Sequence, residues 1–128
     1  MAKANGVSVK QLHFVYDFAV DGGAISEISM GVFLPAGAVV QFGVAQVITA
    51  LVGATATISV GWNGSVTALT AAVAVASWSD NAVIEGVDLI VAMVKVTAIT
   101  ELVIDIATAA LTAGKFYYTC QYIEYPEV

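Results

Sequence analysis

The side chains that most often carry nucleophilic or acid–base chemistry are scarce in this chain. It has one histidine, His13, and one cysteine, Cys120, and no nucleophile-elbow motif surrounds any serine. One histidine and one cysteine cannot supply the three or four nitrogen and sulfur ligands of a zinc site. Cys120 alternates with aromatic residues, and no basic residue lies within four positions to activate its thiol. We therefore predict a buried, inert cysteine and a histidine at the surface or in an interface.

Acidic residues are the remaining candidates for chemistry. Asp80, Glu85 and Asp88 form the densest carboxylate cluster, but their segment lacks the alternating oxygen ligands and central glycine of a calcium loop. A carboxylate pair for glycoside hydrolysis is available by count, yet nothing marks a cleft that combines aromatic and polar groups. We expect a solvated acidic loop, no catalytic residue, no cofactor and no metal. The acids available for such a pair are Asp17, Glu27, Glu101 and Asp105.

The elements that carry these side chains are predicted to be short strands. Apolar residues on even positions alternate with polar or small residues on odd positions, as in a strand with one buried face. Turn sequences such as Asp21-Gly22-Gly23 and Asn63-Gly64 separate the segments. The alternating sets are Leu12, Phe14, Tyr16 and Phe18; Ile28, Met30 and Val32; Ala56, Ile58, Val60 and Trp62; Leu102, Ile104 and Ile106; and Phe116, Tyr118, Cys120 and Tyr122.

Three further segments are less regular. Residues 38–48 are expected to form a strand with Val40, Phe42 and Val44 on one side, and Leu89 to Thr97 another. Residues 69–76 combine alanines that suit a short helix with valines that suit a strand, so their conformation stays open.

Seven or eight short strands without a βαβ rhythm predict an all-β fold, an antiparallel β-sandwich of jelly-roll-like type. The length and the absence of a linker predict a single domain over residues 1–128. Residues 1–25 are predicted either as a strand of this domain or as an N-terminal arm exchanged with a neighbour. Their first residues lack the apolar core of a signal peptide.

The composition points to a surface that another molecule covers. The chain is 59% hydrophobic and 11% charged, and no charged residue occurs from Ile28 through Ser79. A membrane span is disfavoured because Gln41 and Gln46 interrupt the longest apolar stretch. A net charge of −6 and scattered lysines exclude a nucleic-acid partner. A subunit interface is the remaining explanation for so few charges.

Candidate interface residues follow from side-chain type and strand alternation. Tyr117 and Tyr125 fall on the opposite strand face from Tyr118 and Tyr122, and tyrosine suits surfaces that are partly buried and partly wet. The same reasoning adds His13 and Gln41, which lie on the polar sides of their strands.

Several short motifs make the chain similar to a family of small virion proteins of tailed bacteriophages, over roughly residues 30 to 126. They are the step Leu34-Pro35-Ala36-Gly37-Ala38, the strand 54–61 (ATATISVG), the Leu/Ala-rich segment 69–76 and an ending from Leu111 to Tyr125. The resemblance implies a β-sandwich in the phage particle: a capsid decoration (cement) protein, a head-fibre base or a related minor structural protein. Such cement proteins often sit as trimers at local three-fold positions and clamp neighbouring capsid subunits. The family offers no catalytic residues.

The function expected from these observations is therefore structural and not enzymatic. We expect a decoration protein that binds and stabilises the lattice of the major capsid protein, forms a homo-oligomer (a trimer in the resembling family), and sits on the virion after synthesis in the host cytoplasm. One alternative is a tail or head–tail component of the phage. The other is a carbohydrate- or metal-binding β-sandwich module.

Overall fold

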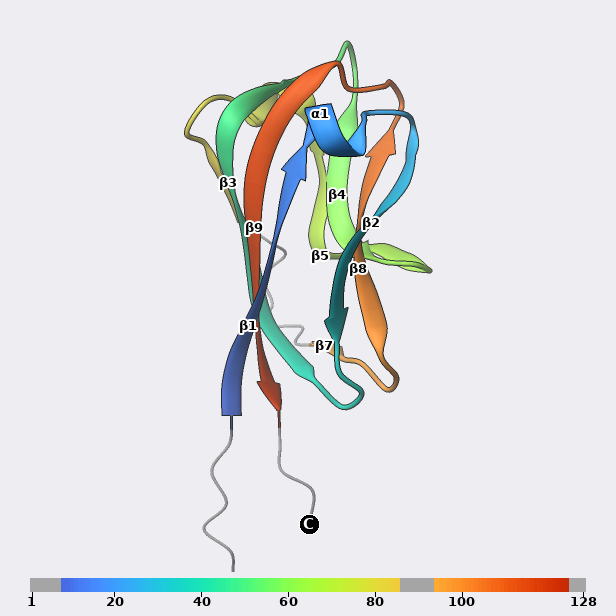
Figure 1. The fold of residues 1–128 in the computed structure, drawn as a ribbon, viewed down its shortest axis with the longest axis vertical. Coiled ribbons are helices and arrows are strands. Elements are labelled where there is room, and N and C mark those ends of the chain that lie inside the picture. Colours follow the sequence, from blue (N-terminus) through green and yellow to red (C-terminus); the bar gives the residue numbers. More distant parts are fainter. Residues whose placement is uncertain (1–7, 86–93, 125–128) are drawn as a thin grey trace, which may run out of the picture.

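The computed structural model describes residues 8–85 and 94–124, which are almost entirely β-structure (Figure 1). Polar–apolar alternation produces the strands, and Gly, Pro, Asn and Asp lie in the turns between them. In chain order the elements are β1 (Ser8–Asp17), α1 (Phe18–Asp21), β2 (Ser26–Leu34), β3 (Val39–Val52), β4 (Thr57–Trp62), β5 (Ser65–Ala74), the 3₁₀ turn Val75–Ser77, β6 (Val83–Glu85), β7 (Val94–Lys95), β8 (Thr100–Ala107) and β9 (Ala113–Glu124).

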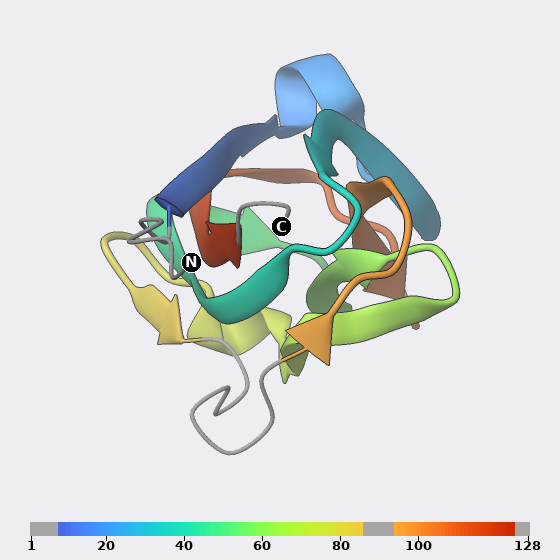
Figure 2. The same ribbon diagram turned by 90° about the horizontal axis from the view of Figure 1, so that it is seen from below.

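The strands form two antiparallel sheets that pack face to face (Figures 1 and 2). Sheet I has the order β1-β9-β3-β6, with the two-residue β7 also paired to β3, and sheet II has the order β2-β8-β4-β5. The chain crosses from one sheet to the other between β1 and β2, β2 and β3, β3 and β4, β5 and β6, β7 and β8, and β8 and β9. This order confirms the predicted all-β antiparallel sandwich.

The core lies between the sheets and is built largely from the predicted even-numbered faces. Phe116, Tyr118 and Cys120 of β9 are fully buried, as are Ile104 and Ile106 of β8. Aromatic rings form its centre: Trp78 lies 4.9 Å from Phe116, and Phe14 stacks on Tyr118 at 5.2 Å, measured between ring centroids. Rings at these separations add to the stability that burial of their area provides.

One buried polar contact joins the two sheets. The hydroxyl oxygens of Thr70 on β5 and Tyr118 on β9 lie 2.8 Å apart. Gly43 on β3 faces the Tyr118 hydroxyl so closely that a Cβ atom built on it would overlap that oxygen. The core therefore accommodates a tyrosine hydroxyl only because residue 43 has no side chain and residue 70 supplies a hydrogen-bonding partner.

The strand predicted over residues 38–48 is correct, but its predicted face is wrong. Val40 is buried, whereas Phe42 is 42% exposed and Gly43 is buried beside it. The register between β3 and β9 shifts between Val40 and Phe42, so one extra residue is accommodated there. Because side chains alternate with period two, this shift turns residues 42–47 to the opposite face, and the register shifts again beyond Val47.

The open segment 69–76 is a strand over residues 69–74 and not an α-helix. These residues belong to β5, which pairs with β4, and the last two residues of the segment begin the 3₁₀ turn at Val75–Ser77. The short α-helix lies instead at Phe18–Asp21, where Asp17 caps it by accepting a hydrogen bond from the Ala19 N–H. Of the strand predicted over 89–97, residues 89–93 lie outside the described part of the chain.

Candidate interaction surface

The outer face of sheet I carries an uncharged surface that spans β1, β9 and β3 and ends on the edge strand β6, where Val83 belongs to it and Glu85 bounds it. Its side chains come from the odd positions of β1 and β9 and from the positions of β3 and β6 that lie opposite them in register. We call this surface the neutral face. Its members are Val9, Gln11, His13 and Val15 on β1; Tyr117, Thr119, Gln121 and Ile123 on β9; Gln41, Phe42, Val44 and Gln46 on β3; and Val83 on β6.

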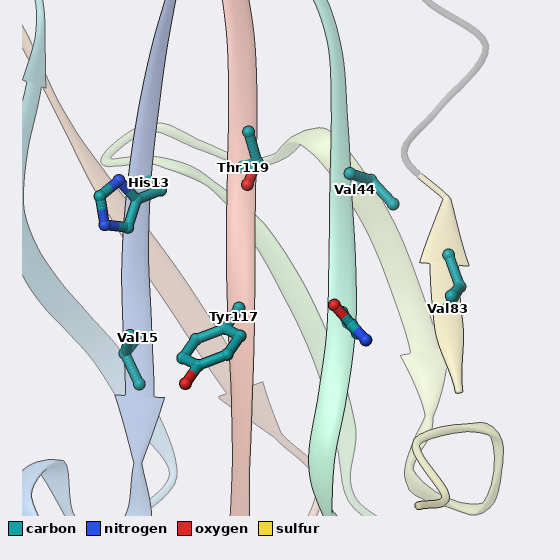
Figure 3. Close-up of a pocket in the computed structure, with 7 residues that line it drawn as sticks. His13, Val15, Val44, Val83, Tyr117 and Thr119 are labelled. Carbon is teal, nitrogen blue, oxygen red and sulfur yellow. The ribbon is translucent and has the colours of Figure 1, made fainter. Parts of the chain in front are cut away.

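A shallow depression of about 570 Å³ occupies the middle of the neutral face. The strand register makes the lining residues of the depression cross-strand neighbours: His13 and Val44 both lie opposite Thr119, and Val15 lies opposite Tyr117. Figure 3 shows these labelled side chains standing on the same side of the sheet, with Val83 at the far strand. The depression is lined by His13, Val15, Val44, Gln46, Val83, Tyr117 and Thr119.

Glutamine side chains cross one end of the neutral face. The Gln121 amide nitrogen donates to the Gln41 side-chain oxygen at 2.9 Å, and the Gln11 amide nitrogen lies 3.4 Å from the Gln121 oxygen. These contacts run from β1 over β9 to β3. They partly satisfy the amides within the sheet, so a partner can cover this end at a smaller cost in lost hydrogen bonds to water.

Charged residues lie at the margins of the neutral face. Asp17 and Lys115 lie opposite each other at one end, and Glu85 lies on the edge strand β6 directly opposite Val44. At the other end Lys95 on β7 lies opposite Val39, and Lys10 pairs with Glu124 at 2.7 Å where β1 begins and β9 ends. By contrast, the outer face of sheet II carries Glu27, Glu101 and Asp105. The two outer faces of the sandwich therefore differ in charge.

The structure brings three of the four predicted interface residues onto one surface. His13, Tyr117 and Gln41 all belong to the neutral face, although they come from three different strands. Tyr125 lies outside the described residues. Two residues of this surface were not predicted. Thr119 could have been found, because it lies two residues from Tyr117 and therefore on the same face of β9. Val83 could not, because the strand β6 was not predicted.

The other candidates for chemistry occupy structural positions. The Asp80 carboxylate accepts a hydrogen bond of 2.6 Å from the backbone N–H of Ala50 and so fixes a loop. Glu85 lies on β6, and Asp88 is outside the described residues. No group of three or more His, Cys, Asp or Glu side chains able to hold a metal ion occurs within residues 8–85 and 94–124. In the same ranges no helix is long and apolar enough to cross a membrane.

Cys120 is buried in the core, as predicted. Burial raises the pKa of its thiol to about 12, because the charged thiolate is poorly solvated there. A thiol with this pKa carries almost no thiolate at neutral pH and is a poor nucleophile.

The raised pKa of Cys120 predicts a loss of stability at alkaline pH. Below pH 9 the thiol keeps its proton in both the folded and the unfolded chain; above it, the unfolded chain releases the proton and the folded chain keeps it up to about 12. The free energy of unfolding should therefore fall by about 1.4 kcal/mol per pH unit in this window from this group alone.

Between pH 8 and pH 11, the free energy of unfolding of the Cys120→Ala variant should fall by about 2–3 kcal/mol less than that of the wild type. Urea unfolding at each pH measures both. Part of the fall should persist in the variant, because burial also raises the pKa of Tyr16 to about 12. Parallel falls in the two proteins would contradict the assignment to Cys120.

Two solved structures contain chains whose fold is similar to that of this chain. No protein-family model matches the chain, and no curated protein matches it by sequence. A chain from the acidic stable capsid structure of Helicobacter pylori bacteriophage KHP30 has a TM-score of 0.66 and 15% identity, over 97% of this chain and 99% of that one. A chain from the capsid asymmetric unit of cyanophage Pam1 has a TM-score of 0.58 and 22% identity, over 96% and 91%.

These likenesses extend over nearly the whole of each chain, so the same complete fold occurs in two phage capsid structures. At this level of identity the comparison defines the fold. It agrees with the β-sandwich fold that the sequence motifs implied.

Proposed function

We propose that this chain is a structural protein of a bacteriophage virion, and specifically a capsid decoration (cement) protein. The observation that carries the proposal is the near-complete match of its fold to chains in the KHP30 and Pam1 capsid structures. In this role it binds the major capsid protein on the outer surface of the shell. It is made in the host cytoplasm and joins the particle as a homo-oligomer, for which the resembling family favours a trimer.

The physical properties of the sandwich support a stabilising role. Its sheets are joined by a continuous aromatic and aliphatic core, which makes it a rigid body able to hold two neighbouring subunits at a fixed spacing. The neutral face gives it a surface that can be covered without burying an unpaired charge. We accordingly propose a binding role and no enzymatic one.

Reconstitution tests this function directly. Purified protein is mixed with phage capsids that lack it, and the mixture is sedimented. We expect the protein to pellet with the capsids up to a fixed ratio, and the decorated capsids to come apart at a higher temperature than the bare ones. Bovine serum albumin is the control for trapped protein.

A protein that remains in the supernatant, and whose sandwich is absent from the shell in an electron-microscopy map of the particle, would contradict the decoration role. Density for the sandwich in the tail or at the head–tail junction would support the tail alternative instead.

A second candidate function rests on a depression of about 450 Å³ on the outer face of sheet II. It brings Trp62 together with Asn63, Glu27 and Ser29, and the Asn63 amide nitrogen lies 3.3 Å from a Glu27 oxygen. An indole beside amide, hydroxyl and carboxylate groups is a combination that binds sugars through stacking and hydrogen bonds. Calorimetric titration with a panel of glycans tests it, and the absence of heat for every glycan would remove it.

A further inference from the structure

We infer that Asn63 is a site of spontaneous deamidation in the folded protein, a modification that adds one negative charge beside the outer face of sheet II. Asn63 and Gly64 form the two-residue turn between β4 and β5, and Trp62 and Ser65 pair across it. The tip of this hairpin projects from the sandwich (Figure 1). The reaction takes place in the free chain and does not depend on the proposed role in a capsid.

The reaction needs only an asparagine side chain, the backbone amide that follows it, and water. The Gly64 nitrogen gives up its proton and attacks the Asn63 side-chain carbonyl carbon, so that a new C–N bond closes a cyclic imide (succinimide). The bond from that carbon to Nδ2 breaks, and the amide nitrogen leaves as ammonia with the transferred proton. Water then opens the ring at either carbonyl carbon, which leaves aspartate or isoaspartate at position 63. No oxidant, reductant or other co-reactant takes part.

The attacking nitrogen is accessible and free to react. Asn63 and Gly64 are exposed, and a Cβ built on Gly64 would meet no atom within 4 Å. Within residues 8–85 and 94–124 the Gly64 N–H donates to no backbone acceptor, so losing its proton breaks no such hydrogen bond. The φ of Gly64 is +88°, which side chains with a Cβ rarely adopt. The turn itself therefore requires after Asn63 the one residue that leaves the nitrogen unobstructed.

Asn81 supplies an internal comparison in the same chain. The N–H of the next residue, Ala82, donates to the Ser79 carbonyl oxygen at 3.0 Å, and Ala82 carries a methyl group beside the nitrogen. The Asn81 N–H in turn donates to the Val47 carbonyl oxygen at 3.1 Å, which ties the loop to β3. Attack by the Ala82 nitrogen has to break the first of these bonds. The folded chain therefore protects Asn81 and leaves Asn63 open to attack.

Deamidation changes the contact between the hairpin and β2. In the unmodified chain the Asn63 Nδ2 atom donates to a Glu27 carboxylate oxygen at 3.3 Å. After the reaction this donor is gone and two carboxylates face each other, which is unfavourable. Isoaspartate also adds a methylene to the backbone of the turn and disturbs the pairing of Trp62 with Ser65. The modified hairpin is therefore less firmly held than the original one.

Peptide mapping by mass spectrometry tests the inference on the wild-type protein. Samples are kept at neutral pH in native buffer or in urea, and conversion of each asparagine is followed over several weeks. In native buffer we expect Asn63 to react at least about tenfold faster than Asn81, a barrier lower by about 1.4 kcal/mol. In urea the hydrogen bond of the Ala82 N–H is lost, so Asn81 should react faster than in native buffer, whereas the rate at Asn63 should change little.

Asn63→Gln is the matched control, because it keeps an amide at the tip of the hairpin but has to close a larger and less favourable ring. Isoelectric focusing should show no added charge in this variant over the period in which the wild type gains one. An Asn63 that reacts in urea and stays intact in native buffer would overturn the inference, since the folded turn would then be protective. Equal rates at Asn63 and Asn81 in native buffer would overturn it as well.

A double-mutant cycle tests the consequence for Glu27. Asn63→Asp places the product carboxylate in the turn, and Glu27→Gln removes the charge that it faces. We expect Asn63→Asp to lower the midpoint of urea unfolding, and to lower it less in the Glu27→Gln background. Equal shifts in the two backgrounds would show that the carboxylates do not meet and would reject this part of the inference.

Discussion

Replacing Trp78 with alanine is expected to lower the free energy of unfolding by about 3–5 kcal/mol. The side chain is fully buried, its ring lies 4.9 Å from that of Phe116, and its indole N–H donates to the Val73 carbonyl oxygen at 3.3 Å. Truncation leaves a cavity between the 3₁₀ turn and sheet I and leaves the carbonyl short of a donor. Since domains of this size are stable by about 5–15 kcal/mol, the loss removes a large part of the total.

The chain supplies a matched control in its second tryptophan. Trp62 lies where β4 ends at the tip of a hairpin and is only partly buried. The Trp62→Ala variant should therefore lose clearly less stability than Trp78→Ala. Urea unfolding of both variants, followed by circular dichroism at one temperature, measures the difference. Equal losses would mean that the interior of the sandwich is not organised around Trp78.

Replacing Gly43 with alanine is expected to cost about 2–4 kcal/mol, although it adds a single methyl group. The new Cβ would overlap the hydroxyl of Tyr118, which is fully buried and hydrogen-bonded to Thr70. Overpacking of this kind costs about 1–3 kcal/mol, and displacing Tyr118 also leaves buried hydroxyls without partners. Chemical denaturation measures the effect.

A double-mutant cycle separates this cause from a general intolerance of β3. Tyr118→Phe alone should cost about 1–3 kcal/mol because the Thr70 hydroxyl loses its partner. In the Gly43→Ala/Tyr118→Phe protein the clashing oxygen is gone, so the combined loss should be smaller than the sum of the single losses. Additive losses would show that the overlap with the hydroxyl is not what makes Gly43 necessary.

The strands that sequence analysis located best are those whose alternation is unbroken. In β9 the predicted apolar residues are the buried ones, because a regular strand repeats its faces every two residues. In β8 the predicted apolar residues are buried too, together with Val103 on the opposite face. In β3 the prediction failed at Phe42, since a register shift relative to β9 depends on the partner strand and leaves no mark in local periodicity. The three-residue β6 was missed because so short a strand has no periodicity to detect.

The sequence predicted single exposed residues of the candidate surface, but not that they lie together on one surface. His13 and Tyr117 were expected to be exposed from the alternation of their own strands, and both belong to the neutral face. Their position beside Val83 could not be predicted, because four strands from distant parts of the chain, β1, β9, β3 and β6, must pair to bring these residues together. The interface role of His13, Tyr117 and Gln41 stays a prediction.

The sequence by itself determined that the chain is built of strands with one apolar and one small or polar face, and that it has very little charge to place on its surface. Both follow from local alternation and composition, which need no knowledge of strand partners. The tertiary structure alone decided which outer face is neutral and which is acidic. Burial of the apolar faces accompanies the pairing of β1, β9 and β3 in one sheet and of β2, β8 and β4 in the other. That pairing gathers mostly uncharged side chains on the outer face of sheet I and carboxylates on that of sheet II.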